Sequence, residues 1–384
     1  MKLHQWKKAK QKIEEQQKKD ENGKFIFDLN NEEDKNLLIK KAFCLEGLSD
    51  WENLLELGDD LTKINIETEK IQNDSKKEDI NLNISLVLSK AALNLGNWDK
   101  LKEYSKNIKS VEDDEIYEEK FFKAIVAIKD KEYETARKYI DIARDLIDDK
   151  IKALLNESYE RAYKLLLDNE NLCQLEDIIK LQKNNFNDEL LYKQKKEELK
   201  AQWDKCLELN KEDIKAYERI VGIRRIILSP EEDYLASLDL SQICRRKDKF
   251  TTCKLVLNRL QNSLKNSEPD VTARVGLSIG KFIHDDNDDP DNLDKEIKEL
   301  EKIVNININK VNDELKSKIY CYYGMWRTEK IEKNLNEKDV NNILHDLELS
   351  TKYNENNYKA WHSYAFLNYK FFEYIKKNKN KLCY

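Results

Sequence analysis

Apolar side chains recur along this chain at the spacing of helical turns. In residues 123–147, Ile125, Ile128, Ile140 and Ala143 fall on one side of a helix, and Lys, Glu, Asp and Arg occupy positions between them. This period is typical of an amphipathic helix. Almost every apolar residue elsewhere is also followed by a charge within four positions. We therefore expect an all-α protein made of thin helical layers, as in helical repeat proteins.

A loosely repeated unit joins these helices. In CLEGLSDWENLLEL (44–57) and ALNLGNWDKLKEYS (92–105), a helix ends near a Gly, a polar pair follows, and a Trp begins a new amphipathic run. The aromatic residues at this position of successive units are Trp51, Trp98, Tyr133, Phe250 and Trp326. Intervals of 47 and 35 residues separate the first three, close to the lengths of known helical hairpin repeats. We predict a solenoid of tetratricopeptide- and HEAT-like hairpins in which each aromatic residue begins the second helix.

Two further segments predict individual helices. SPEED (229–233) has the features of a helix start, with Ser229 as N-cap, Pro230 in the first position and acids in the first turn. YKAWHSYAFLNYKFFEY (358–374) places aromatic residues at helical spacing, so a ligand-binding aromatic cage and a buried helix are the two interpretations. We predict a buried core stripe, formed by Tyr358, Trp361, Ala365, Phe366 or Tyr369, and Phe372.

Composition limits the classes of function. The 384 residues include only 3 Pro and 8 Gly, which disfavours a large β-protein. The net charge of −6 argues against general nucleic-acid binding, which needs a surplus of clustered Lys and Arg. The chain has no apolar run long enough to predict a membrane span. Because its 7 Cys form no C-x-x-C pair, we expect reduced thiols in a cytosolic protein.

The sequence contains no recognisable catalytic or metal-binding motif. Its 4 His do not pair with one another or with Cys at ligand spacing. HDDNDDPDNLDKE (284–296) lacks the Gly and Glu of a calcium loop, so we expect an inter-helix loop there. Phosphate-binding loops, kinase active-site motifs and the Gly-x-Ser-x-Gly elbow are also missing. We therefore assign no catalytic residue, no metal site and no required cofactor.

Basic residues form one candidate binding feature. Arg224 and Arg225 lie in VGIRRIIL, Arg245 and Arg246 lie in a predicted turn, and Lys281 follows in a later helix. Equivalent positions of successive hairpins can converge on one surface, where such cations would bind an anion. The alternative is that they are ordinary surface charges among 69 Lys and Arg.

Several segments together resemble the FAT domain of the TOR (target of rapamycin) kinases, which are phosphatidylinositol-3-kinase-related Ser/Thr protein kinases. The most specific segments follow the family order: NLGNWD, ARDLIDD, ESYERAY, ILSPEED and YKAWH. KAFCLEGLSDWENL and the opening LHQWKKAKQKIE are also similar, so the resemblance covers roughly residues 3–374. It predicts a C-shaped FAT-domain solenoid over residues 1–376 and a polar tail over residues 377–384.

The resemblance implies a non-catalytic scaffold. FAT domains clamp a kinase domain that lies C-terminal to them, and neither that domain nor the rapamycin-binding segment is expected within these residues. The implied partners are the kinase domain of a parent TOR chain and raptor-type regulatory subunits, in complexes that control growth in response to nutrients. The expected location is the cytoplasm, or the periphery of endomembranes as part of a TOR complex. A free-standing tetratricopeptide-like adaptor and a FAT segment of another family member are the alternatives.

The resemblance also implies a ligand. TOR and several relatives carry a basic FAT pocket that holds an inositol polyphosphate, so inositol hexakisphosphate is the expected structural ligand. The residues that align with Arg or Lys of the family are Arg224, Arg246, Lys281 and Lys318. Tyr322 and Met325 stand where the family segment is basic. We predict an inositol polyphosphate pocket that uses those four cations.

Overall fold

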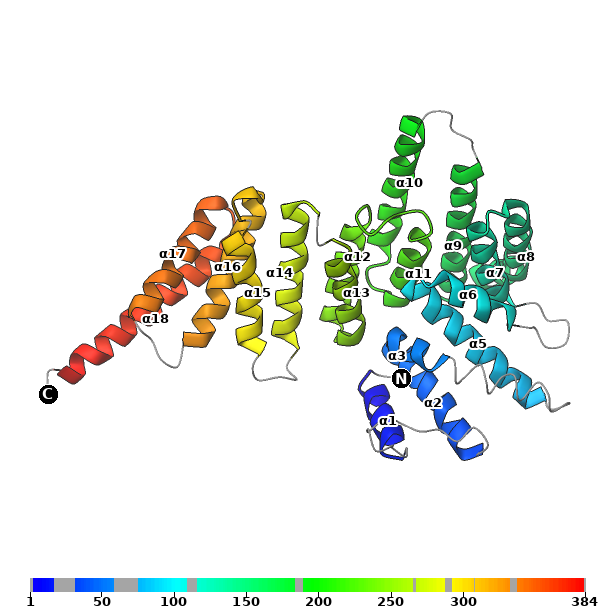
Figure 1. Cartoon of the computed structure of the whole chain (residues 1–384), viewed down its shortest axis with the longest axis horizontal. Helices are drawn as coiled ribbons and strands as arrows, with labels where there is room; N and C mark the ends of the chain where they lie inside the picture. The colour runs from blue at the N-terminus through cyan, green and yellow to red at the C-terminus, as the bar shows by residue number, and fades with distance from the viewer. Residues whose placement is uncertain are drawn as a thin grey trace. The chain divides into compact units, whose positions relative to one another are not determined.

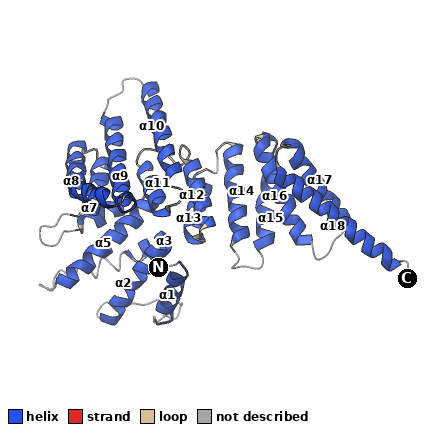
Figure 2. Ribbon diagram, turned by 180° about the vertical axis from the view of Figure 1, so that it is seen from behind, coloured by secondary structure: helices blue, strands red, loops and turns tan. Residues whose placement is uncertain are grey.

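The computed structural model describes residues 3–16, 32–58, 75–108, 116–183, 189–264, 267–286, 292–306, 308–331 and 337–382. Every regular element in these residues is a helix (Figure 1, Figure 2). The predicted all-α helical solenoid class is therefore confirmed. The chain divides into two compact units, Met1–Ala236 and Ser237–Tyr384, which we call unit 1 and unit 2.

Unit 1 is a series of helices in which neighbours along the chain pack on one another. They are α1 (Leu3–Gln16), α2 (Glu32–Leu48), α3 (Trp51–Glu56), α5 (Ser75–Leu95), α6 (Trp98–Lys106), α7 (Tyr117–Lys129), α8 (Tyr133–Glu157), α9 (Tyr159–Lys183), α10 (Glu189–Leu209) and α11 (Ile214–Arg224). The most extensive packing joins α7 to α8 and α8 to α9, and α11 returns to contact both α5 and α9. Fully buried apolar side chains such as Leu45, Phe121 and Ile179 form the core of this unit.

Unit 2 continues the series. It contains most of α12 (Tyr234–Arg246), followed by α13 (Phe250–Ser263), α14 (Pro269–Asp285), α15 (Asn292–Ile306), a 3-10 helix (Ile308–Lys310), α16 (Asp313–Ile331), α17 (Glu337–Tyr353) and α18 (Tyr358–Leu382). One core cluster includes Leu300, Ile319 and Trp326. A second cluster joins α17 to α18. Each cluster buries the apolar stripes of amphipathic helices, as the sequence pattern predicts.

One tight turn recurs between four helix pairs. Its left-handed residue is Ser49, Gly96, Lys131 or Asp248, with φ of 55°, 65°, 63° and 58° respectively. The next N–H donates to a carbonyl five residues earlier, as from Asn97 to Ala92 at 2.9 Å and from Glu132 to Ala127 at 2.8 Å. This is the Schellman pattern that ends a helix. The next helices begin at Trp51, Trp98, Tyr133 and Phe250, which confirms the predicted role of these aromatic residues.

The fifth aromatic residue, Trp326, does not begin a helix, so the prediction was wrong there. Trp326 lies inside α16 and is buried. Gly324 precedes Trp326 by two residues, as the left-handed Gly96 precedes Trp98, but the backbone of Gly324 is helical. A Cβ on Gly324 would lie 2.6 Å from Cδ2 of Leu347 on α17. Gly324 therefore allows α16 and α17 to approach closely and does not form a turn.

The predicted helix start at Ser229 is a hydrogen-bonded turn. Its backbone N–H donates to Oε2 of Glu232 at 2.8 Å, and the Glu232 N–H donates to Oγ of Ser229 at 3.3 Å. This reciprocal pair is the capping box expected at such a position. The helix itself, α12, begins only at Tyr234. The intervening Asp233 is buried and accepts hydrogen bonds from Arg224.

Two predictions fall partly outside the described residues. Residues 287–291 of the acidic stretch 284–296 and residues 383–384 of the predicted tail are not among them. Within the described part, no group of His, Cys, Asp and Glu could hold a metal ion. None of the described helices is both long enough and apolar enough to cross a membrane.

Candidate functional site

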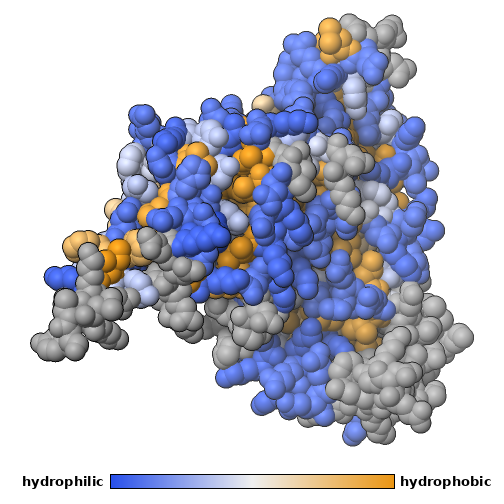
Figure 3. Space-filling model, turned by 60° about the vertical axis from the view of Figure 1, so that its left-hand side comes forward, coloured by the Kyte–Doolittle hydropathy of each residue, from blue (hydrophilic) through white to orange (hydrophobic). Residues whose placement is uncertain are grey.

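The aromatic stripe of α18 is exposed, which corrects the prediction that it is core. The exposed fraction is 83% for Tyr358, 48% for Trp361, 60% for Tyr369 and 65% for Phe372. Phe366 is also exposed. The face of the molecule shown in Figure 3 is mainly hydrophilic, with hydrophobic side chains exposed in separate places. We call this surface of α18 the aromatic face.

The opposite side of α18 packs on the rest of unit 2. Leu367 is completely buried against Val340, Ile343 and Leu347, and Tyr364 and Phe371 pack on the same cluster. At 3.6 residues per turn, Leu367 lies on the other side of the helix from Tyr369 and Phe372. The helix thus has apolar residues on two sides. Periodicity alone cannot tell which side faces the core, and the prediction selected the outer one.

A basic cluster lies on the helices of unit 2. The Lys281 ammonium group of α14 lies 4.3 Å from the centre of the Tyr322 ring on α16. Lys359 of α18 lies 4.2 Å from the same ring centre and donates a hydrogen bond to Oη of Tyr322 at 3.2 Å. Arg245 of α12 is close enough to act electrostatically on Lys281, and it also pairs with Asp285. Two cations from α14 and α18 therefore meet at one phenol on α16, and a third cation on α12 influences Lys281 electrostatically.

The pKa directions reflect this crowding of cations. Burial lowers the pKa of Lys281, and the charges of Arg245 and Lys359 lower it further, although Tyr322 opposes them. Burial would raise the pKa of Tyr322, but the ammonium groups of Lys281 and Lys359 outweigh it and lower that pKa. An anion placed at the cluster would relieve the repulsion between these cations.

The other predicted cations of unit 2 do not contact Tyr322 through the interactions described above. Arg246 is exposed in the last turn of α12. Lys318 lies one turn before Tyr322 on α16, half-exposed, and pairs with Glu314 at 2.6 Å. Of the four residues predicted from sequence, Lys281 is the one that the structure brings into contact with Tyr322.

Arg224, in unit 1, is completely buried in a carboxylate network. Its Nε donates to Oδ1 and Oδ2 of Asp233 at 3.0 and 3.1 Å, and Nη2 donates to Oδ1 of Asp204 at 2.7 Å. Burial lowers the pKa of Arg224, but its hydrogen bonds to Asp233 and Asp204 outweigh this and raise it. Asp233 and Asp204 therefore contact Nε and Nη2 of Arg224, whereas its buried Nη1 has no hydrogen-bond partner among the described residues.

Sequence reasoning missed Lys359 and chose Arg246 rather than its neighbour Arg245. Successive side chains of a helix point about 100° apart, so only one of two adjacent residues faces a given neighbouring helix. The spacing between distant segments of the sequence does not tell which of the two it is. Lys359 lies in YKAWH, a segment that was interpreted from its aromatic residues. The sequence feature that could have indicated Lys359 is a single cation in the first turn of this aromatic-rich segment.

Comparison with known proteins decides the family. The model of the FAT domain matches residues 87–382, which is more than half of the chain. The chain belongs to the FAT domain family. Both the basic cluster and the aromatic face lie within the matched residues.

Relatives of this FAT domain chain are TOR kinases. It is 25% identical to the serine/threonine-protein kinase tor1 of Schizosaccharomyces pombe over 99% of its length. It is 24% identical to the serine/threonine-protein kinase mTor of Drosophila melanogaster over 96%, and 25% identical to TOR2 of Saccharomyces cerevisiae over 87%. The chain spans 14–16% of the length of these curated relatives. The predicted resemblance to the FAT domain of TOR is thereby confirmed.

Proposed function

We propose that this chain is a non-catalytic scaffold segment of a TOR-type serine/threonine protein kinase and that the aromatic face of α18 packs on the kinase domain of that protein. The exposed aromatic face carries the proposal. Burying one aromatic side chain of this size contributes about 2–3 kcal/mol, so an aligned set of them favours a permanent contact. The similarity to TOR kinases supplies the nature of the partner.

The aromatic face also bears on the adaptor alternative. Tyr369 and Phe372 are more than half exposed on α18. An exposed apolar surface of this kind supports packing on a partner domain rather than a free-standing adaptor. Raptor-type regulatory subunits and a cytoplasmic location are part of the same proposal, because they follow from the TOR relationship.

Site-specific crosslinking tests the scaffold proposal. In the complete polypeptide that carries this segment, a photoreactive phenylalanine at position 372 should crosslink to kinase-domain peptides. Tyr159 is a matched control, since it is 64% exposed on α9 of unit 1 against 65% for Phe372. The same probe at position 159 should give no kinase-domain crosslink. Crosslinks from position 372 to separate proteins alone would favour the adaptor.

A second candidate function is binding of an inositol polyphosphate at the basic cluster. Lys281 and Lys359 both lie against the Tyr322 ring, and the charges of Lys359 and Arg245 are unfavourable to the charged form of Lys281. A polyphosphate between them would form charge-assisted hydrogen bonds and stabilise unit 2 by mass action. The predicted residues Arg246 and Lys318 belong to the same unit and add positive charge to it. Inositol hexakisphosphate is the ligand that this proposal names.

Calorimetry of the chain with inositol hexakisphosphate at moderate salt tests this second function. The double variant K281Q/K359Q should bind at least tenfold more weakly, because two charge-assisted contacts are lost. The control is K352Q, since Lys352 is an exposed lysine on α17 that pairs with Glu348. Absence of binding to the unaltered chain, or equal affinity of the double variant, would exclude the site.

A further inference from the structure

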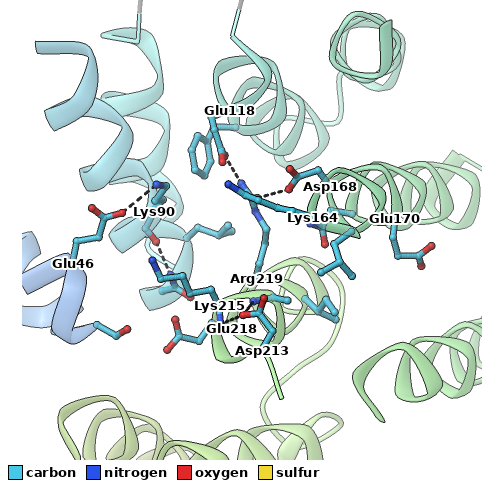
Figure 4. A pocket seen from close by; sticks show the side chains of 18 of the residues that line it. Glu46, Lys90, Glu118, Lys164, Asp168, Glu170, Asp213, Lys215, Glu218 and Arg219 are labelled. Carbon is cyan, nitrogen blue, oxygen red and sulfur yellow. Dashed lines mark hydrogen bonds and ion pairs between the residues drawn. The ribbon is translucent and has the colours of Figure 1, made fainter. Parts of the chain in front are cut away.

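Unit 1 contains a cavity of about 360 Å³ that the features above do not use (Figure 4). Its lining comes from α2, α3, α5, α7, α9 and α11, so segments from Glu46 to Ile220 meet around it. Figure 4 shows Lys90, Glu118 and Arg219 directed into this space from three different helices. The volume falls within the range of small-molecule pockets, roughly 300–1,000 Å³.

The charges on the walls favour a cation. The described lining contains six carboxylates and four cations. The carboxylates are Glu46, Glu118, Asp168, Glu170, Asp213 and Glu218, and the cations are Lys90, Lys164, Lys215 and Arg219. Arg219 already pairs with Glu118 and, at 2.9 Å, with Asp168. Lys90 pairs with Glu46 at 3.1 Å. The pairs within the wall leave a surplus of negative charge.

The N-terminus of α11 lies on this wall but does not offer an anion site. Asp213 is its N-cap, and its Oδ1 accepts hydrogen bonds from the backbone N–H groups of Lys215 at 2.9 Å and Ala216 at 3.2 Å. Those donors are the ones that a helix N-terminus would present to an anion. Glu218 lies in the first turns of the same helix and is only 5% exposed.

The remaining lining is mainly apolar. It consists of Trp51, Leu93, Phe122, Leu167, Ala216 and Ile220, together with the polar residues Ser49, Asn94 and Asn171. A ligand that matches both parts of the wall needs a positively charged end and an apolar stem. We propose that this cavity binds an aliphatic ammonium or guanidinium group carried on an apolar stem. Such a group can come from a free polyamine or from a Lys or Arg side chain of a peptide.

Calorimetric titration of the whole chain tests this proposal with two probes. One probe is spermidine, and the other is the capped tripeptide Ala-Arg-Ala. Saturable binding of either probe supports a site for an aliphatic cation. The probe that binds more tightly shows whether that cation belongs to a free polyamine or to a side chain of a peptide. If neither probe binds at millimolar concentration, or if inorganic sulfate binds at the cavity instead, the proposal is overturned.

Conservative variants connect the binding to the cavity. E218Q and D213N should each weaken binding about tenfold, because each removes one negative charge from the lining without changing side-chain volume. The control E134Q removes an exposed carboxylate of α8 that pairs with Lys183 outside the cavity lining, and its affinity should equal that of the unaltered chain. Asp213 is exposed, and Asn is as good an N-cap as Asp, so D213N remains a valid test if E218Q does not fold. Equal affinities of D213N and E134Q would overturn the proposal.

Discussion

At the scale of single residues, Arg224 is a predicted ligand residue that the structure places in a buried ion pair. Its guanidinium group is 0% exposed and pairs with Asp233, which is itself 4% exposed. Removing one partner of a buried ion pair leaves the other charge uncompensated, at a cost of about 3–5 kcal/mol. We therefore expect Arg224→Leu to reduce the free energy of unfolding by this amount, measured by chemical denaturation.

The matched control for Arg224 is Arg246, which was predicted from the same sequence pattern. Arg246 is exposed in the structure, so Arg246→Leu should change the free energy of unfolding by no more than about 0.5 kcal/mol. Similar effects of the two substitutions would contradict the structural role of Arg224.

His284 predicts a pH dependence for unit 2. Its Nδ1 lies 3.1 Å from Oε2 of Glu296, which is completely buried, and its ring stacks on Trp326. The hydrogen bond to Glu296 raises the pKa of His284 above its usual 6.5, although burial opposes it. A raised folded pKa means that this contribution to stability is complete below pH 6.5 and is lost as the pH rises through the folded pKa.

Thermal unfolding of the chain and of His284→Gln over pH 5.5 to 8.5 measures this effect. We expect the unaltered chain to have the higher Tm at low pH and the difference to shrink as the pH rises. His362→Gln is the control, because His362 is exposed on α18. A difference that grows with pH would show that His284 and Glu296 do not form the charged pair.

At the scale of elements, the recurrent turn has a conformational preference that substitution can reveal. Lys131 is exposed and adopts φ of 63°, a region that costs an L-residue about 1–2 kcal/mol relative to glycine. Lys131→Gly should therefore raise the free energy of unfolding by about 1 kcal/mol in chemical denaturation. Gly96→Ala, at the equivalent position with φ of 65°, should lower it by a similar amount.

A side-chain effect at position 131 must be separated from the backbone effect. Lys131→Ala removes the same side chain but keeps the L-residue, so it should give none of the gain of the glycine variant. Equal gains from the two variants would refute the backbone explanation.

These elements also show how far the sequence predicts the structure. The turns before Trp98 and Tyr133 were predictable because turn chemistry and helix period are local. The position of Trp326 inside a helix and the exposure of the aromatic face of α18 were not predictable in this way. The role of Gly324 depends on Leu347, which lies more than twenty residues away in sequence. For the basic cluster, the sequence predicted Lys281 but not Lys359, because their meeting at Tyr322 requires the packing of α14, α16 and α18.

At the scale of the whole molecule, the division into two compact units predicts separable folding. The two core clusters described above for unit 2 are formed by its own residues, including Trp326 in one and Leu367 in the other. A chain of residues 229–384 keeps the capping turn before α12 and both clusters. We expect it to be helical by circular dichroism and to unfold cooperatively, since helical repeats are stabilised by contacts between neighbours.

The His284 substitution shows whether this fragment has the same interior as the intact chain. Because His284, Glu296 and Trp326 all lie in unit 2, His284→Gln should lower the Tm of the fragment at low pH, and the effect should shrink as the pH rises, as in the intact chain. A helical fragment in which the substitution has no effect would have lost the packing of α14 on α15 and α16. An unfolded fragment would mean that unit 2 depends on residues before Ser229, and the division at Ala236 would then separate compact regions but not folding units.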